Sequence, residues 1–255
     1  MPQQIFDAHL HIIDPGYPLI ENNGFLPAEF TARDYQQRLG GLPVSGGAVV
    51  SGSFQGFDQD YLIAALQELG PNYVGVTQIP LSTSEEDILR LDQAGVRAVR
   101  FNLFRGGSES LEAMDSLARK VYEVAGWHTE LYVDSRDLAD LHPKLKGLPE
   151  LSIDHLGMHE EGLPHLLRLV EDGAYVKATG FGRITMDPIR VVQEIVATNP
   201  RALMVGTDLP STRARRPFEA EDFLRVSQAI DPQLVPEIFW GNAASLYLKR
   251  PRTEG

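Results

Sequence analysis

The first predicted strand is the stretch Ile-Phe-Asp-Ala-His-Leu-His, residues 5–11. Alternate residues of an extended strand share one face, so we expect Asp7, His9 and His11 to point the same way. Two imidazoles side by side on a buried strand are typical of a site that needs donors, acceptors or lone pairs. The stretch therefore predicts a buried strand with a functional site at its end.

Further apolar, β-rich runs follow this strand at 47–51, 73–79, 96–104, 127–133, 151–155, 175–179 and 202–208. Segments with helical spacing lie between and after them, at 31–39, 57–69, 84–94, 110–125, 163–171, 188–197, 220–230 and 235–248. Alternating strands and helices predict parallel pairing with right-handed crossovers, and eight such units close a barrel. An open doubly wound sheet is the rival, but no Gly-x-Gly-x-x-Gly follows the first strand. We therefore predict an α/β fold, a (β/α)₈ TIM barrel formed as a single domain by residues 1–255.

Composition narrows the possible functions. The chain has 255 residues, no cysteine and a formal net charge of −12. Without cysteine there are no disulfides, thiolate nucleophiles or Cys-ligated metals. The negative charge argues against nucleic acid or an anionic membrane as a partner. No apolar run of ~18 residues and no basic leader are present, so we expect a cytoplasmic protein without a membrane span. A homo-oligomer is compatible with the sequence.

Polar residues cluster where the predicted strands end, which is the end of such barrels that carries the chemistry. They are His9, His11, Ser51, Ser53, Gln78, Arg100, Asn102, Arg105, Tyr132, Asp134, Asp154, His155, Thr179, Arg183 and Asp208. An arginine presents a planar fork that binds a carboxylate with two hydrogen bonds. Several such forks in an acidic chain predict a locally positive site and an anionic small-molecule substrate.

Five motifs in order along the chain resemble the amidohydrolase superfamily. They are Asp-x-His-x-His at 7–11, Gly-Val-Arg-Ala-Val-Arg-Phe-Asn at 95–102, Asp-His-Leu-Gly at 154–157, Gly-Thr-Asp-Leu-Pro at 206–210 and Gly-Asn-Ala-Ala-Ser-Leu-Tyr at 241–247. Within that superfamily the chain resembles the branch of the 2-pyrone-4,6-dicarboxylate lactonases and related sugar lactonases. The resemblance implies a (β/α)₈ barrel, in agreement with the strand count.

The resemblance also implies an activity, the hydrolytic opening of the lactone ring of a carboxylated substrate during breakdown of aromatic or sugar acids. Asp208 would be the base that activates water, and three histidines would cradle the lactone carbonyl and stabilise its oxyanion: His9, His11 and His155. Substrate-binding residues would be Arg100, Arg183, Tyr132, Asn102 and Arg105, the last offset by one residue from the family's position.

A metal ion is the main open question for the implied site. In this superfamily His-x-His often binds a divalent ion, and binuclear members need a lysine on the fourth strand, which 96–104 lacks. One ion such as zinc would fit His9, His11, His155 and Asp208. The dicarboxylate lactonase works without a metal, so we expect no required cofactor. The alternatives are a mononuclear metal-dependent decarboxylase or amidohydrolase, and a non-catalytic ligand-binding barrel.

Structural explanations compete for several of these residues. His9 and His11 could be core histidines, Asp208 a turn former and Arg100 an ion-pair partner. Arg183 could be solvated, and Tyr132 could pack in the core with its hydroxyl satisfied. The cluster Arg213, Arg215 and Arg216 after the last strand is either a solvated loop face or a guard of the entrance.

Overall fold

The structure, a computed structural model, describes residues 2–248. Eight strands form one sheet in chain order, and each neighbouring pair is parallel. They are β1 (Ile5–Leu10), β2 (Val44–Val50), β3 (Tyr73–Thr77), β4 (Val96–Asn102), β5 (His128–Tyr132), β6 (Leu151–Ile153), β7 (Tyr175–Ala178) and β8 (Leu203–Val205). The last and first strands meet beyond their regular parts, where Asp208 N donates to His9 O (2.7 Å) and His11 N to Leu209 O (2.8 Å).

These contacts join the two ends of the sheet, and the predicted (β/α)₈ barrel is confirmed. The extent of the domain, 1–255, stays a prediction. Residues 1 and 249–255 lie outside the described part of the chain.

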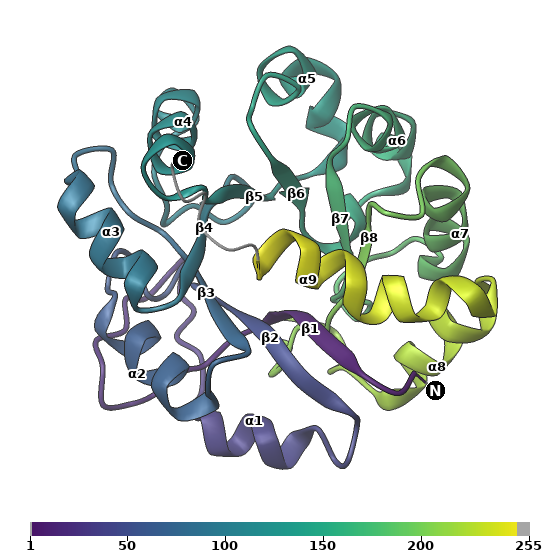
Figure 1. Cartoon of the computed structure of the whole chain (residues 1–255), viewed down its shortest axis with the longest axis horizontal. Helices are drawn as coiled ribbons and strands as arrows, with labels where there is room; N and C mark the ends of the chain where they lie inside the picture. The colour runs from purple at the N-terminus through teal and green to yellow at the C-terminus, as the bar shows by residue number, and fades with distance from the viewer. Residues whose placement is uncertain (1, 249–255) are drawn as a thin grey trace, which may run out of the picture.

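Helices follow the strands, and all but the last lie around the outside of the barrel (Figure 1). They are α1 (Ala32–Arg38), α2 (Asp60–Leu69), α3 (Glu85–Gln93), α4 (Met114–Ala125), α5 (Leu138–Leu145), α6 (Leu163–Glu171), α7 (Pro188–Thr198), α8 (Ala220–Ala229) and α9 (Asn242–Tyr247). Local chemistry starts several of them: Ser84 Oγ accepts a hydrogen bond from Asp87 N at the first turn of α3 (3.1 Å), as its Ser-Glu-Glu-Asp start predicts. Between residues 2 and 248, no helix combines the length and the apolar character that crossing a bilayer requires.

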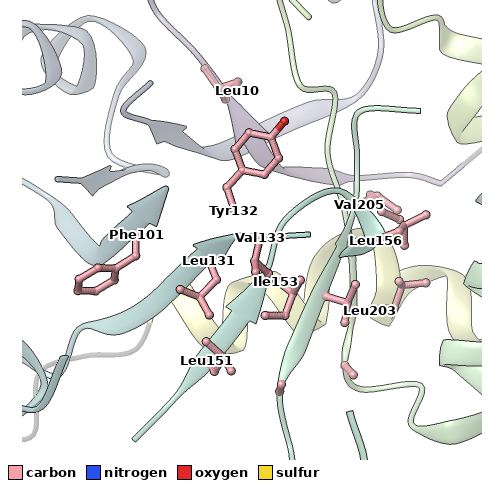
Figure 2. Close-up of a cluster of buried hydrophobic side chains, with 14 of the residues drawn as sticks. Leu10, Phe101, Leu131, Tyr132, Val133, Leu151, Ile153, Leu156, Leu203 and Val205 are labelled. Carbon is pink, nitrogen blue, oxygen red and sulfur yellow. The ribbon is translucent and has the colours of Figure 1, made fainter. Parts of the chain in front are cut away.

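Two apolar cores lie on the two sides of the strands. The larger contains strand residues such as Phe101, Leu131 and Ile153 (Figure 2). The buried faces of the outer helices pack against these residues. The smaller lies inside the barrel and includes Phe6 and Met204. Successive strand residues alternate between these two sides, which is why the strands of the barrel are apolar almost throughout.

The helix α9 covers one end of the barrel (Figure 1). Its Ala243, Leu246 and Tyr247 belong to the inner core, and the Tyr247 ring stacks on Phe6 of β1 at 5.4 Å. The sequence predicts one helix over 235–248, but a π-helical turn, Glu237–Gly241, precedes α9. We call the end that α9 covers the floor of the barrel. Because the floor is closed, a small molecule can enter only at the opposite end, where the strands finish.

The first strand differs from the expectation for its three polar residues. The pairing of β1 with β2 is irregular between Asp7 and Leu10. Asp7 accepts hydrogen bonds from Tyr35 Oη of α1 (2.9 Å) and from Thr207 N (2.8 Å), so it ties β1 to α1 and to β8. The prediction that Asp7 shares a face with the histidines is therefore wrong, because the irregularity breaks the strict alternation on which it depends.

Candidate active site

His9 and His11 lie at the end of β1 with exposed fractions of 0 and 4%. Their rings meet edge to face at 5.0 Å. His11 Nδ1 lies 2.7 Å from the carbonyl oxygen of Val50, which can only accept a hydrogen bond. The proton of neutral His11 is therefore on Nδ1, and its Nε2 carries a lone pair toward the site.

His155 lies two residues beyond the end of β6, in a backbone conformation that few side chains adopt, with φ of 51°. Its Nδ1 lies 2.8 Å from the hydroxyl of Thr179 at the end of β7. Gly180, itself at φ of +64°, passes so close that a Cβ there would lie 2.6 Å from His155 Nδ1. A residue without a side chain is required at this position for the imidazole to sit where it does.

Asp208 follows β8 and also has a left-handed backbone, with φ of 59°. Its Oδ1 lies 3.6 Å from His11 Nε2 and 3.9 Å from His9 Nε2. Arg183 forms a two-pronged pair with it, from Nε to Oδ2 at 2.5 Å and from Nη2 to Oδ1 at 3.0 Å. Positive φ at two buried non-glycine residues, His155 and Asp208, is the kind of strain that gathers at functional sites.

The protonation states in this cluster follow from burial and from Arg183. Burial alone would raise the pKa of Asp208, but the Arg183 guanidinium outweighs burial and holds that pKa well below its usual range. Burial lowers the pKa of His9 to about 3 and lowers that of His155 well below its ordinary value. At neutral pH the site therefore holds one carboxylate beside two neutral imidazoles, His9 and His155.

A small pocket beside this cluster is lined by four arginines, Arg100, Arg105, Arg183 and Arg213. Arg183 is paired with Asp208, and Arg100 with Asp154 at 2.8 Å. Arg105 and Arg213 have no carboxylate within 4 Å in the described part of the chain, and Arg105 Nε is buried without a hydrogen-bond partner there. The pocket thus presents two guanidinium groups whose charge is not neutralised.

The sequence-predicted residues Tyr132 and Asn102 line the same pocket. The Tyr132 hydroxyl is buried and has no hydrogen-bond partner among the described residues. Figure 2 shows it pointing away from Leu131 and Ile153, past the end of its strand. The side chain of Asn102 accepts a hydrogen bond from Arg105 N (2.8 Å), so it shapes the loop that carries Arg105.

The donor atoms also suit a metal ion. One ligand atom each of His9, His155 and Asp208 lie within 4.8 Å of one another, and His9 Nε2 is buried without a hydrogen-bond partner. His11, the fourth ligand that the sequence predicts, lies outside this group of three, although its Nε2 is 3.6 Å from Asp208 Oδ1. Neutral imidazoles and a carboxylate are the ligands of mononuclear zinc sites, so these residues fit such an ion.

Sequence reasoning gave no role to three buried charged residues below this cluster: Glu130, Asp154 and Lys177. A signal was present, because Glu130 and Lys177 interrupt strands expected to be apolar on both faces. Of the arginine cluster after β8, only Arg213 lines the pocket. Arg216 pairs with Asp222 at 2.6 Å, and Arg215 is exposed.

Comparison with known proteins shows the family to which this (β/α)₈ barrel belongs. The sequence profile of the amidohydrolase family matches residues 6–249, so this chain belongs to the amidohydrolase family. The chain is thus an enzyme of hydrolase type.

Two characterised relatives are similar over long stretches. The 2-pyrone-4,6-dicarboxylate hydrolase of Comamonas testosteroni is 27% identical over 166 residues, which is 62% of this chain and 53% of that protein. This match therefore spans about half the length of the relative. The D-galactarolactone isomerase of Agrobacterium fabrum is 24% identical over 244 residues, 89% of this chain and 83% of that protein.

Solved structures share the fold over nearly the whole chain. A ligand-free Agrobacterium tumefaciens protein superposes with a TM-score of 0.86 at 22% identity, covering 98% of both chains. An Acinetobacter baumannii protein assigned as a 2-pyrone-4,6-dicarboxylic acid hydrolase, solved with citric acid bound, gives 0.82 at 23% identity, covering 96% of this chain and 99% of the other.

Proposed function

We propose that this enzyme hydrolyses the lactone ring of a small molecule that carries at least one carboxylate. The observation that supports this most is the meeting of Asp208 with three histidines beside a pocket lined by arginines. Both relatives are named for lactones. One is a hydrolase of 2-pyrone-4,6-dicarboxylate, and the other is an isomerase of D-galactarolactone. A lactone is a cyclic ester, and its opening needs an activated water and a stabilised carbonyl oxygen.

Asp208 is the base in this proposal. It takes one proton from a water molecule while the water oxygen bonds to the lactone carbonyl carbon. The ring C–O bond then breaks, and the released ring oxygen receives the proton from Asp208, so one water is added in total. Arg183 holds Asp208 ionised through two hydrogen bonds. If Arg183 also binds a substrate carboxylate, its guanidinium group must divide its hydrogen bonds between Asp208 and the substrate.

His11 and His155 differ in whether they can donate a hydrogen bond to the carbonyl oxygen of the lactone. Neutral His11 donates toward Val50, so its Nε2 accepts and cannot donate to an oxyanion. His155 has a hydroxyl partner, Thr179, which can itself donate to Nδ1. His155 can therefore keep its proton on Nε2 and donate to the developing oxyanion, together with the unpartnered hydroxyl of Tyr132.

A divalent ion is compatible with the same residues. His9, His11, His155 and Asp208 would hold it, and when bound it would polarise the carbonyl and acidify a water. This donor set supports the alternative function, a mononuclear metal-dependent decarboxylase or amidohydrolase. Metal content of the purified protein, with activity before and after chelation, separates the two: one tightly held ion per chain and loss of activity on chelation favour the alternative.

The substrate's charge should be recognised by the arginines without a carboxylate partner. Burial lowers the pKa of Arg213, and the nearby charge of Arg105 lowers it further. An anion between two such groups relieves their repulsion and gains charge-assisted hydrogen bonds. The proposed substrate therefore carries a carboxylate on the side of the pocket formed by Arg105 and Arg213.

The test is Asp208→Asn, assayed on a panel of lactones with and without carboxylates, including 2-pyrone-4,6-dicarboxylate. We expect a folded protein whose kcat falls by a factor of about 10³ or more, because the amide cannot accept the proton. The matched control is Asp115→Asn on the exposed surface of α4, which should retain wild-type activity. Near-normal turnover by Asp208→Asn would contradict the proposal, as would hydrolysis of uncharged lactones only.

A further inference from the structure

A cluster of buried charges lies inside the barrel between the site and the floor. Lys177 of β7 forms an ion pair with Glu130 of β5, and its Nζ lies 3.3 Å from Asp154 Oδ1 at the end of β6. Asp154 Oδ2 accepts from Arg100 of β4 through Nη2 (2.8 Å) and Nε (3.1 Å). These side chains are at most 3% exposed, so each depends on its partners for its charge to be tolerated.

Asp154 also reaches the candidate active site. Its Oδ1 lies 3.3 Å from His9 Nδ1, on the opposite edge of the imidazole from Nε2, which lies 3.9 Å from Asp208 Oδ1. Neither His9 Nδ1 nor Asp154 Oδ1 has an aligned hydrogen-bond partner within residues 2–248. The two carboxylates, Asp154 and Asp208, therefore lie on opposite edges of the same ring.

We infer that Asp154 is a positioning residue, which holds His9 with its proton on Nδ1 and its Nε2 lone pair toward Asp208 while its other oxygen fixes Arg100. A carboxylate behind a histidine commonly selects the tautomer and the ring orientation in this way. The two oxygens of Asp154 have different partners, since Oδ1 faces His9 and Oδ2 accepts hydrogen bonds from Arg100. A single side chain thereby couples the cluster around Asp208 to a wall of the arginine pocket.

Lys177 completes the arrangement from the other side. It lies between two carboxylates, Glu130 and Asp154, and keeps Asp154 Oδ1 from repelling Glu130. Glu130 is anchored in turn by His128 Nε2 (3.1 Å) and by the hydroxyl of Tyr247 on α9. The position of Asp154 is therefore set by groups on β5, β7 and the floor, none of which contacts Asp208.

The first experiment is kinetic, and this readout rests on the proposed lactone hydrolysis. Asp154→Asn should lower kcat about 10- to 100-fold, because an amide presents an NH₂ group or a weaker acceptor to His9. The control His128→Gln removes a contact of Glu130 without touching His9, and should change stability but leave kcat within about 2-fold. Loss of kcat in both variants in proportion to lost stability would overturn the inference.

A double variant separates positioning from simple structural support. Asp154→Asn with Lys177→Met removes one negative and one positive charge, so the net charge of the cluster is unchanged. We expect it to recover much of the thermal stability that Lys177→Met loses, while kcat stays as low as in Asp154→Asn. Recovery of kcat together with stability would show that Asp154 only balances charge, and would refute the positioning role.

A second readout does not depend on any substrate. In ¹⁵N-histidine-labelled protein, long-range ¹H–¹⁵N spectra report which ring nitrogen carries the proton, and His9→Gln assigns the signals. Wild type should show His9 protonated on Nδ1, and Asp154→Asn should move signal toward the other tautomer. A wild-type His9 protonated on Nε2 would overturn the inference even if lactones are hydrolysed. If no lactone is hydrolysed but the tautomer is as stated, only the proposed function fails.

Discussion

Removing Arg183 should expose how strongly the site depends on one buried ion pair. Its side chain is 7% exposed and that of Asp208 is 0% exposed, and the two share two contacts. Arg183→Met leaves the carboxylate buried without its main countercharge, a change that typically costs about 3–5 kcal/mol. For a chain of 255 residues this corresponds to a fall in Tm of about 6–9 °C.

Urea and thermal unfolding at pH 7 measure the loss, with Arg215→Met as the control, because Arg215 is exposed on a neighbouring loop. The double variant Arg183→Met with Asp208→Asn should be more stable than Arg183→Met alone, since no charge is then left unpaired. The gap between Arg183→Met and wild type should also narrow as the pH falls, because a protonated Asp208 needs no cation. A loss below about 0.5 kcal/mol, or no recovery in the double variant, would refute this account of the pair.

Three further predictions concern other parts of the site. The pKa of His9 is about 3 in the fold and near 6.5 when unfolded, so below pH 6.5 only the unfolded chain takes up its proton. The free energy of unfolding should therefore fall by up to ~1.4 kcal/mol per pH unit as the pH is lowered from 6 to 4. Urea titrations should show a shallower dependence on pH for His9→Gln, and an equal slope in wild type and variant would contradict this explanation. Gly206→Ala should cost about 1–3 kcal/mol by thermal unfolding, because its Cβ would lie 2.7 Å from both His9 N and Thr179 Cγ2; an unchanged Tm would count against this. Arg213→Gln should raise KM about 10- to 100-fold for a carboxylated lactone and leave an uncharged one unaffected, and equal effects on both would exclude a role in charge recognition.

Much of the fold could be predicted because the barrel repeats one pattern. Apolar strands alternating with amphipathic helices specify parallel neighbours, and the ends of the strands then identify a single rim. This reasoning brought His9, His155 and Asp208 together from positions far apart in the chain, and the structure places them within one cluster. Their catalytic roles stay predictions.

The parts that could not be predicted depend on details that periodicity does not contain. The irregularity of β1 between Asp7 and Leu10 separates Asp7, which contacts Tyr35, from the histidines that follow it, and no rule of alternation anticipates such a break. The pairing of Lys177 with Glu130 joins strands that are not neighbours, so only the closed barrel brings them together. Arg213 lies on a loop, and it is the fold of that loop that turns it into the pocket rather than into solvent.

The last helix also determines when the interior can be completed during synthesis. Tyr247 gives Glu130 one of its hydrogen bonds and stacks on the ring of Phe6, a residue of the first strand, which is made long before α9. Until that tyrosine has left the ribosome, the ionised groups in the middle of the barrel stay open to water from below. The newly made chain therefore cannot seal its charged interior until α9 has been translated, and a truncation before α9 would leave the barrel without its floor.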